Sequence, residues 1–297
     1  MTARTNDIQH SLFGGVSNAK IEHDYIEIVP GLALQSTYAH VMSPYMMAFS
    51  KPANPGEHHP APWKAVKGGP SFDVSLQIFL EENFRPTNFN RINTIWWLFA
   101  LLRLHHSSGV RIPVISNQSF HAVTENNSEP TFWPMEIDNK LIAFDGLKHE
   151  TIVDNNTISW LRQHFVSTAR LMENSGFNLA FRALSSSHRA SSIGEAMLLI
   201  WSAIEALFRP GSNKITHKLS LAVATCIEDD PSDRDKTYQK VRSLYAVRGQ
   251  ISHAAEKPSI EDTISSYKIA RKCFLKAMEN TSIPDFSNLE VKWKTRT

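Results

Sequence analysis

Hydrophobic and polar residues alternate in the first half of the chain, most clearly in the segment 72–80. Apolar residues occupy every second position there, with Asp73, Ser75 and Gln77 between them, which is the period of a strand that buries one face. Other segments have the composition of strands: Tyr25 to Val29, Leu32 to Thr37 and Val110 to Ile115. Pro113 directs the last of these towards a sheet edge, because proline cannot donate a ladder hydrogen bond.

The period changes to that of helices in the second half of the chain. In the segment 193–208, apolar residues recur every three or four positions, as a helix with one buried face requires. The segments 215–226 and 260–278 repeat the pattern, and a capping-type Ser259 precedes the second, with Asp262 three residues on. Further helices are predicted, the first of them in the strand-rich half: Asn90 to His106, Trp160 to Ser175, Phe177 to Leu184 and Asp233 to Ser252.

These patterns predict an α+β fold in which a mixed, β-rich N-terminal domain precedes an all-α antiparallel helical bundle. The polar, asparagine-rich segment Val153 to Thr157 marks the boundary, since linkers between domains are polar and exposed. We therefore expect a mixed domain over residues 1–152, a helical domain over 153–280 and a tail over 281–297. Four prolines between Lys51 and Trp63 predict a long loop in the first domain.

The charge balance and the cysteine content limit the classes of function. The chain has 31 basic and 29 acidic residues and a net charge of +2, so any contact with nucleic acid must be local. Cys226 and Cys273 lie among apolar residues in helical segments, which indicates reduced core residues and not disulfides or a zinc site. The longest apolar run, Ile92 to Leu104, is too short to span a membrane, and the opening residues lack a signal-peptide core. We expect a soluble, cytoplasmic protein.

One pair of residues in the helical half has the types and spacing of a candidate catalytic site. Arg248 and His253 lie five positions apart in one predicted helix. Such pairs also arise by chance, and two others of similar spacing occur: Arg4 with His10, and Arg182 with His188. The first of these lies in a polar segment without a helical stripe, and the second runs off the end of a predicted helix. The surrounding residues therefore decide which pair matters.

The residues around Arg248 contain further elements in a distinctive order. Residues 201–208 read Trp-Ser-Ala-Ile-Glu-Ala-Leu-Phe, residues 214–220 read Lys-Ile-Thr-His-Lys-Leu-Ser, and Arg234 follows. Residues 244–253 then read Leu-Tyr-Ala-Val-Arg-Gly-Gln-Ile-Ser-His. This order and spacing resembles the ApeA-like branch of the HEPN superfamily, and the resemblance covers the helical half of the chain.

The resemblance implies a metal-independent endoribonuclease without a cofactor, in which two chains pair and their Arg/His motifs meet at the dimer cleft. RNA supplies its own nucleophile in the 2′-hydroxyl, so the protein needs a group that exchanges protons near neutral pH and a cation for the phosphorane. His253 would be the acid/base, and Arg248 would hold the phosphate and stabilise its developing charge. The expected product end is a 2′,3′-cyclic phosphate. Such an enzyme would act as a toxin or an antiviral defence effector.

The same resemblance suggests residues that support the pair. Glu205 is placed to orient Arg248, although a purely structural ion pair explains this glutamate equally well. Tyr245 contributes to the apolar side of the helix that carries Arg248. A basic segment could supply local positive charge for RNA, or it could be a solvated helix start: Lys214, His217 and Lys218.

Gly249 departs from the pattern of the superfamily. Active members often carry Asn, Asp or His directly after the arginine, and this chain has glycine. Five residues of an ideal helix turn through about 140°, so Arg248 and His253 share a face only if the helix loosens. Glycine, which is unfavourable inside a helix, could permit that loosening or could mark a lost catalytic position.

Two other functions remain open at this point. In one, the helical domain is a catalytically inactive module that binds RNA or protein as a regulator or scaffold, which Gly249 favours. In the other, the N-terminal domain is a small-ligand sensor that gates the helical domain. In the ribonuclease interpretation, that domain would instead sense a trigger or contact a protein partner. The glycine pairs of that domain lack the spacing of a phosphate-binding loop.

Two other features receive structural interpretations. Trp96 and Trp97 lie in an apolar run and are expected in the core, because stacking platforms for bases need exposed rings with basic neighbours. No metal site is predicted, because further ligands do not follow either histidine pair at suitable spacing. These pairs are His58 with His59 and His105 with His106.

Overall fold

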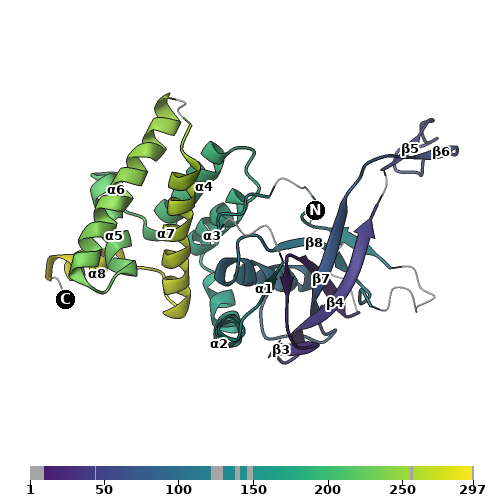
Figure 1. Ribbon diagram of the computed structural model, residues 1–297, viewed down its shortest axis with the longest axis horizontal. Helices are drawn as coiled ribbons and strands as arrows, with labels where there is room; N and C mark the ends of the chain where they lie inside the picture. Colours follow the sequence, from purple (N-terminus) through teal and green to yellow (C-terminus); the bar gives the residue numbers. More distant parts are fainter. Residues whose placement is uncertain are drawn as a thin grey trace.

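The structure, a computed structural model, describes residues 10–43, 45–121, 130–137, 141–145, 150–254 and 257–295. Within them, a six-stranded antiparallel sheet with strand order β3-β4-β7-β1-β8-β9 lies at one end of the molecule (Figure 1). Its strands are β1 (Leu12–Ser17), β3 (Tyr25–Val29), β4 (Leu32–Met42), β7 (Ser71–Leu80), β8 (Arg111–Ser116) and β9 (Phe132–Pro134). Two small sheets accompany it: β2 (Ala19–Lys20) with β10 (Thr151–Ile152), and β5 (Tyr45–Ala48) with β6 (Trp63–Val66).

The predicted strands are confirmed, but the position expected for Pro113 is wrong. Strand β8 pairs with β1 on one side and with β9 on the other, so it is not an edge strand. The register shifts between Gly15 and Ser17 of β1, where Ile112 and Pro113 together face one residue. Proline is tolerated in such a bulge, because the ladder is interrupted there and needs no donor at that position.

Helices form the rest of the described chain, and the α+β class is confirmed. All predicted helices are present, and the helix at 193–208 has the predicted bounds. The Ser259 side chain accepts a hydrogen bond from the backbone NH of Asp262, which begins the 260–279 helix as expected. The helices are α1 (Arg91–His105), α2 (Asn155–Leu171), α3 (Ser175–Ser187), α4 (Ile193–Phe208), α5 (Ile215–Ile227), α6 (Pro231–Ala254) and α7 (Ile260–Glu279).

An eighth helix, α8 (Phe286–Thr295), lies in the segment expected only as a tail, and it packs against α5. None of its residues is fully buried, so the sequence carries only a weak amphipathic signal for it. Elsewhere, Cys273 is a fully buried core residue as expected, whereas Cys226 is only partly buried against the core. In the described ranges, no helix combines the length and apolar character needed to cross a membrane.

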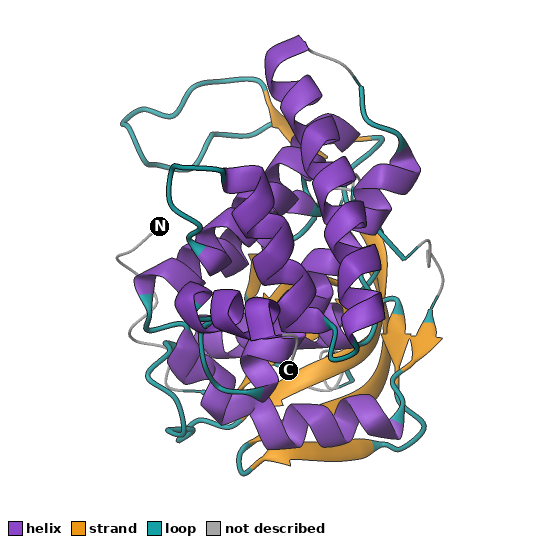
Figure 2. Ribbon diagram, turned by 90° about the vertical axis from the view of Figure 1, so that its left-hand side faces the viewer, coloured by secondary structure: helices purple, strands orange, loops and turns teal. Residues whose placement is uncertain are grey.

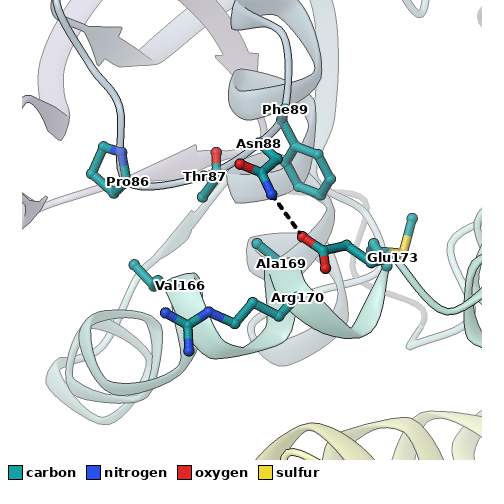
Figure 3. Close-up of a pocket in the computed structure, with 9 residues that line it drawn as sticks. Pro86, Thr87, Asn88, Phe89, Val166, Ala169, Arg170 and Glu173 are labelled. Atoms are coloured by element: carbon teal, nitrogen blue, oxygen red, sulfur yellow. Dashed lines mark hydrogen bonds between the residues drawn. The ribbon is translucent and has the colours of Figure 1, made fainter.

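One continuous hydrophobic core joins the sheet to the helices. Figure 2, viewed from the helical end, shows helices in front of the strands. Helix α1 lies against the sheet and also contacts α2 and α7 (Figure 1). Its Trp97 is fully buried, with its ring 4.9 Å from that of Phe181 on α3. Trp96 packs edge-on against the same phenylalanine, so both tryptophans belong to the core as predicted. The division into domains at residue 152 stays a prediction, because the apolar cluster crosses it.

A buried ion pair joins α1 to the segment that follows β9. The guanidinium of Arg103 faces the carboxylate of Glu136 with both terminal nitrogens, one of them at 2.9 Å. Both side chains are buried, with exposed fractions of 3% and 8%. Arg103 also donates to the carbonyl oxygen of Val110 at 2.8 Å. The pair therefore has the bidentate geometry and extra hydrogen bonds that buried charges need.

The carboxyl end of α1 is closed by a side chain from α7. The guanidinium of Arg271 donates to the backbone carbonyl oxygens of Leu104 and His105. The last carbonyls of a helix lack partners within the helix and carry partial negative charge, so a cation stabilises them. This contact fixes α7 against α1 and so ties the helical half to the sheet half.

Candidate functional site

Four of the residues highlighted by the sequence meet where α4 and α6 pack together. Trp201 and Glu205 lie four positions apart on α4, and Tyr245 and Arg248 lie three positions apart on α6. Residues with these spacings share one face of a helix. The two faces oppose each other, which brings the four side chains into one cluster, hereafter the Arg248 cluster.

Glu205 is the centre of the cluster. One of its carboxylate oxygens, Oε1, lies 3.4 Å from Nη2 of Arg248 and accepts a hydrogen bond of 2.8 Å from the hydroxyl of Tyr245. The guanidinium of Arg248 also lies over the Tyr245 ring, 5.6 Å from its centroid. The ion pair expected from the sequence is therefore present, and Tyr245 holds the carboxylate from a second side.

The guanidinium of Arg248 is held but not enclosed. Its side chain is 25% exposed and that of Glu205 is 30% exposed, so both reach the protein surface. The Nε atom of Arg248 is shielded from solvent and has no hydrogen-bond partner within the described part of the chain. A buried donor without a partner costs about 1 to 3 kcal/mol. This nitrogen is therefore an unused donor on a guanidinium that solvent can reach.

Tyr245 acts as a hydrogen-bond donor at neutral pH. Burial raises the pKa of its hydroxyl to about 12, and the adjacent Glu205 carboxylate, which favours the protonated phenol, adds to the shift. The phenol therefore keeps its proton throughout the physiological range. It positions Glu205 and cannot serve as a general base there.

The indole of Trp201 packs against the ring of Tyr245. It is fully buried and meets the Tyr245 ring edge to face, with 5.3 Å between the ring centroids. The indole Nε1 donates to the hydroxyl of Ser266 on α7 at 3.2 Å. Sequence reasoning did not identify Ser266, whose only signal is a small polar residue inside the apolar stripe of 260–278. Three helices thus fix the position of the Tyr245 ring.

The helix does not loosen at Gly249, although loosening is one of the two possibilities that the sequence leaves open for this glycine. Helix α6 continues through Gly249 to Ala254, so the backbone positions 248 and 253 stand about 7.5 Å apart along the axis and about 140° apart around it. The side chain of His253 lies outside the described residues, as does Arg4 of an alternative pair. Within one chain, the backbone of α6 turns positions 248 and 253 towards different sides.

Gly249 has open space around it, and this leads to a stability prediction. A Cβ atom placed there would meet no atom within 4 Å. We expect Gly249→Ala to raise the free energy of unfolding by about 0.5 to 1 kcal/mol, because alanine has the higher helix propensity. Urea denaturation measures this change, and Ala246→Gly, at an exposed position three residues earlier in α6, should produce a loss of similar size. A loss of stability in Gly249→Ala would show that the backbone at this position needs glycine.

The basic residues suggested for RNA lie away from the Arg248 cluster. His217 on α5 shares a hydrogen bond of 2.8 Å with the hydroxyl of Tyr238 near the start of α6. Lys218 lies over the ring of Phe286 on α8, 5.8 Å from its centroid. Tyr238 precedes Arg248 by ten helical residues, which is about 15 Å along the axis. The structure therefore does not bring His217 and Lys218 together with Arg248, and Lys214 directly precedes the same helix, α5.

The remaining histidine candidates have structural surroundings. His188, from the alternative pair with Arg182, is 2% exposed, and burial lowers its pKa to about 3. His105 stacks on Trp160 with ring centroids 4.7 Å apart, and burial lowers its pKa to about 4. Both imidazoles therefore stay neutral at physiological pH. In the described ranges, no group of three or more histidine, cysteine or acidic side chains could hold a metal ion.

Comparison of the chain with protein-family models, with curated proteins and with solved structures found no match in any of the three.

Proposed function

We propose that this protein is a metal-independent endoribonuclease of the HEPN type that cleaves RNA at a site composed of two chains. The observation that carries the proposal is the Arg248 cluster, in which Glu205 and Tyr245 hold a partly exposed guanidinium at the surface of a helical bundle. The order of the motifs along the helical half agrees with it. The role proposed for the enzyme is that of a cytoplasmic toxin or antiviral defence effector.

In this proposal Arg248 binds the scissile phosphate. Its Nε has no partner among the described residues, and its Nη2 lies at a salt-bridge distance from Glu205. Phosphate oxygens can approach the solvent-exposed part of the guanidinium, which presents its donors in a planar fork, while Nε stays shielded. The 2′-hydroxyl attacks the phosphorus, the 5′-oxygen of the next nucleotide leaves, and a 2′,3′-cyclic phosphate remains. The charge that develops on the phosphorane is stabilised by the guanidinium.

His253 is proposed as the group that transfers protons. It takes the proton from the 2′-hydroxyl or delivers one to the departing 5′-oxygen, which imidazole can do near neutral pH. Positions 248 and 253 lie about 140° apart on one straight helix, so the proposal pairs Arg248 of one chain with a histidine from a second copy. The proposed enzyme is therefore a homodimer formed through the helical domain. Its N-terminal domain contacts a protein partner or senses a trigger.

Incubation of the purified chain with labelled RNA in excess EDTA tests the proposal. We expect cleavage that continues in EDTA, fragments that end in 2′,3′-cyclic phosphate, and no cleavage of RNA in which every 2′-hydroxyl is methylated. The rate per chain should fall on dilution below the dimerisation constant, which light scattering measures separately. Intact RNA at concentrations where the chain is dimeric, or fragments with 3′-hydroxyl ends, would contradict the proposal.

A second candidate function is a catalytically inactive helical module that binds RNA or protein. The observation that favours it is Gly249, whose position offers space for a side chain but no polar group. The carboxylate of Glu205 also partly neutralises Arg248. Binding of RNA by the Arg248 cluster without cleavage in the same assay would select this candidate.

A further inference from the structure

Strands β5 and β6 form an arm that leaves the body of the protein. The arm comprises residues 45–67, and its two strands pair with each other and with no other described strand. Figure 1 shows it beyond the end of β4 and β7, at the opposite end of the long axis from α6. An isolated two-stranded ribbon is at best marginally stable in water. A bound partner would therefore stabilise the exposed arm.

Large apolar side chains on the arm point into solvent. Monomeric proteins seldom expose such residues together unless the surface binds something. The exposed set comprises Tyr45 at 62%, Met46 at 57%, Met47 at 45%, Phe49 at 57% and Trp63 at 55%. The register places Tyr45 opposite Val66 and Ala48 opposite Trp63, so the rings of Tyr45 and Trp63 lie on opposite faces of the ribbon.

The indole of Trp63 is fixed so that mainly its face is left for a ligand. Its Nε1 donates to the carbonyl oxygens of His59 and Pro60 at 2.9 and 3.1 Å. The loop behind it is closed by a hydrogen bond of 2.8 Å between His59 Nδ1 and the carbonyl oxygen of Ser50. The polar edge of the ring is therefore already satisfied within the chain. A partner gains most from stacking on the ring, and little side-chain freedom is lost when it does so.

Positive charge accompanies the exposed rings. Lys51, Lys64 and Lys67 lie in the arm, and Glu57 is its one acidic residue. All three lysines are exposed, and none of them forms an ion pair among the residues that the structure describes. Lys64 lies across from Met47 in the ribbon and directly follows Trp63. Exposed aromatic faces next to unpaired cations are the two features that sites for single-stranded nucleic acid combine.

We propose that the arm is a binding platform for single-stranded RNA, with bases stacking on Tyr45 and Trp63 and phosphates contacting the lysines. Rings on both faces of a narrow ribbon suit a flexible strand that wraps around it, whereas a bilayer or a flat protein surface contacts only one face. The positive charge favours a polyanion over a second copy of this arm, which would bring like charges together. The choice of RNA rests on the proposed ribonuclease function, but binding by the arm does not require cleavage.

Binding is measured with fluorescein-labelled 2′-O-methyl oligouridine about 20 nucleotides long, which lacks the nucleophile and stays intact. We expect the logarithm of the association constant to fall with the logarithm of salt with a slope of about −2, because three lysines contact phosphates. Lys64→Glu with Lys67→Glu should weaken binding by about tenfold or more. Lys268→Glu with Arg189→Glu makes the same change of charge at two exposed positions away from the arm, one on α7 and one in the turn after α3, and it should leave affinity within about twofold.

Tryptophan fluorescence separates stacking from charge. Oligouridine should quench the parent chain, and Trp63→Phe should lose most of the quenching while it keeps an aromatic face and most of the affinity. Tyr45→Ala should weaken binding by about 5- to 150-fold, the range found when one stacking ring is removed. Circular dichroism establishes that each variant is folded.

Several outcomes would overturn the inference. The inference fails if the control charge reversals weaken oligouridine binding as much as the charge reversals in the arm do. It also fails if oligouridine still quenches the fluorescence of Trp63→Phe as it does that of the parent. Arm variants that abolish self-association or binding to anionic phospholipid vesicles while oligouridine binding stays unchanged would assign the arm to one of those partners. Binding by the arm without RNA cleavage would leave the platform standing and refute the ribonuclease. RNA cleavage by a chain whose RNA binding is unchanged in the arm variants would refute the platform and leave the ribonuclease standing.

Discussion

Replacing Arg248 with alanine is expected to slow RNA cleavage by a factor of about 10² to 10³, the usual effect of removing one donor that stabilises developing charge. The substitution removes the guanidinium proposed to bind the phosphate. Folding should change little, because a partly exposed ion pair such as Arg248 with Glu205 contributes at most about 1 kcal/mol. Single-turnover cleavage rates in EDTA, together with urea denaturation, measure the two effects separately.

Three companion variants sharpen this test. Arg242→Ala removes an exposed arginine from the same helix and should leave the rate unchanged. Arg248→Lys keeps the charge but not the planar fork, so its rate should lie between those of the parent and the alanine variant. His253→Ala should lose activity to a similar degree, and mixing it with Arg248→Ala should restore part of the activity if each site takes one residue from each chain. Parent-like cleavage by Arg248→Ala would refute the proposed site.

Glu136→Ala is expected to destabilise the fold by about 3 to 5 kcal/mol, because it leaves the guanidinium of Arg103 buried without its counter-charge. The carboxylate is 8% exposed and Arg103 is 3% exposed, so water cannot replace the lost partner. The free energy of unfolding from urea denaturation measures the change. A loss of this size is about a fifth or more of the stability of an ordinary domain.

The matched control is Glu150→Ala, which removes one partner of the exposed pair formed by Lys20 and Glu150 at 3.2 Å. Exposed pairs contribute about 0 to 1 kcal/mol, so this variant should remain close to the parent. Replacing both buried partners, as in Arg103→Met with Glu136→Leu, should cost less than Glu136→Ala alone, since no uncompensated charge remains. Equal losses for Glu136→Ala and Glu150→Ala would show that Arg103 finds another partner.

The helices and central strands could be predicted because one face of each is buried. The 193–208 stripe gave the bounds of α4, and Ser259 marked the start of α7. Local patterns failed where burial was absent or pairing was irregular. Helix α8 and the arm have few buried residues, and the position of Pro113 depends on a bulge that only the register with β1 creates. Long-range pairing decides such features, and residue spacing does not report it.

Helix faces and the order of the motifs predicted only part of the candidate site. They placed Glu205 beside Arg248, and the structure has that contact. Two hydrogen bonds depend on how α4, α6 and α7 cross: the one from Tyr245 to Glu205 and the one from Trp201 to Ser266. Crossing geometry follows from packing between side chains that are distant in the sequence. The exposed rings of the arm were missed because sequence composition does not distinguish an exposed aromatic residue from a buried one.

The guanidinium that closes the carboxyl end of α1 has a mechanical consequence. Arg271 belongs to the same helix as Ser266, whose hydroxyl receives the indole NH of Trp201. A partner bound to the sheet half that displaced α1 would also displace α7, because Arg271 joins the two helices. Ser266 and Trp201, which position the Tyr245 ring, would then shift as well. A displacement at the strand-rich end would thereby be passed on through α7 to the Trp201–Ser266 hydrogen bond, to the ring contact between Trp201 and Tyr245, and through Glu205 to Arg248.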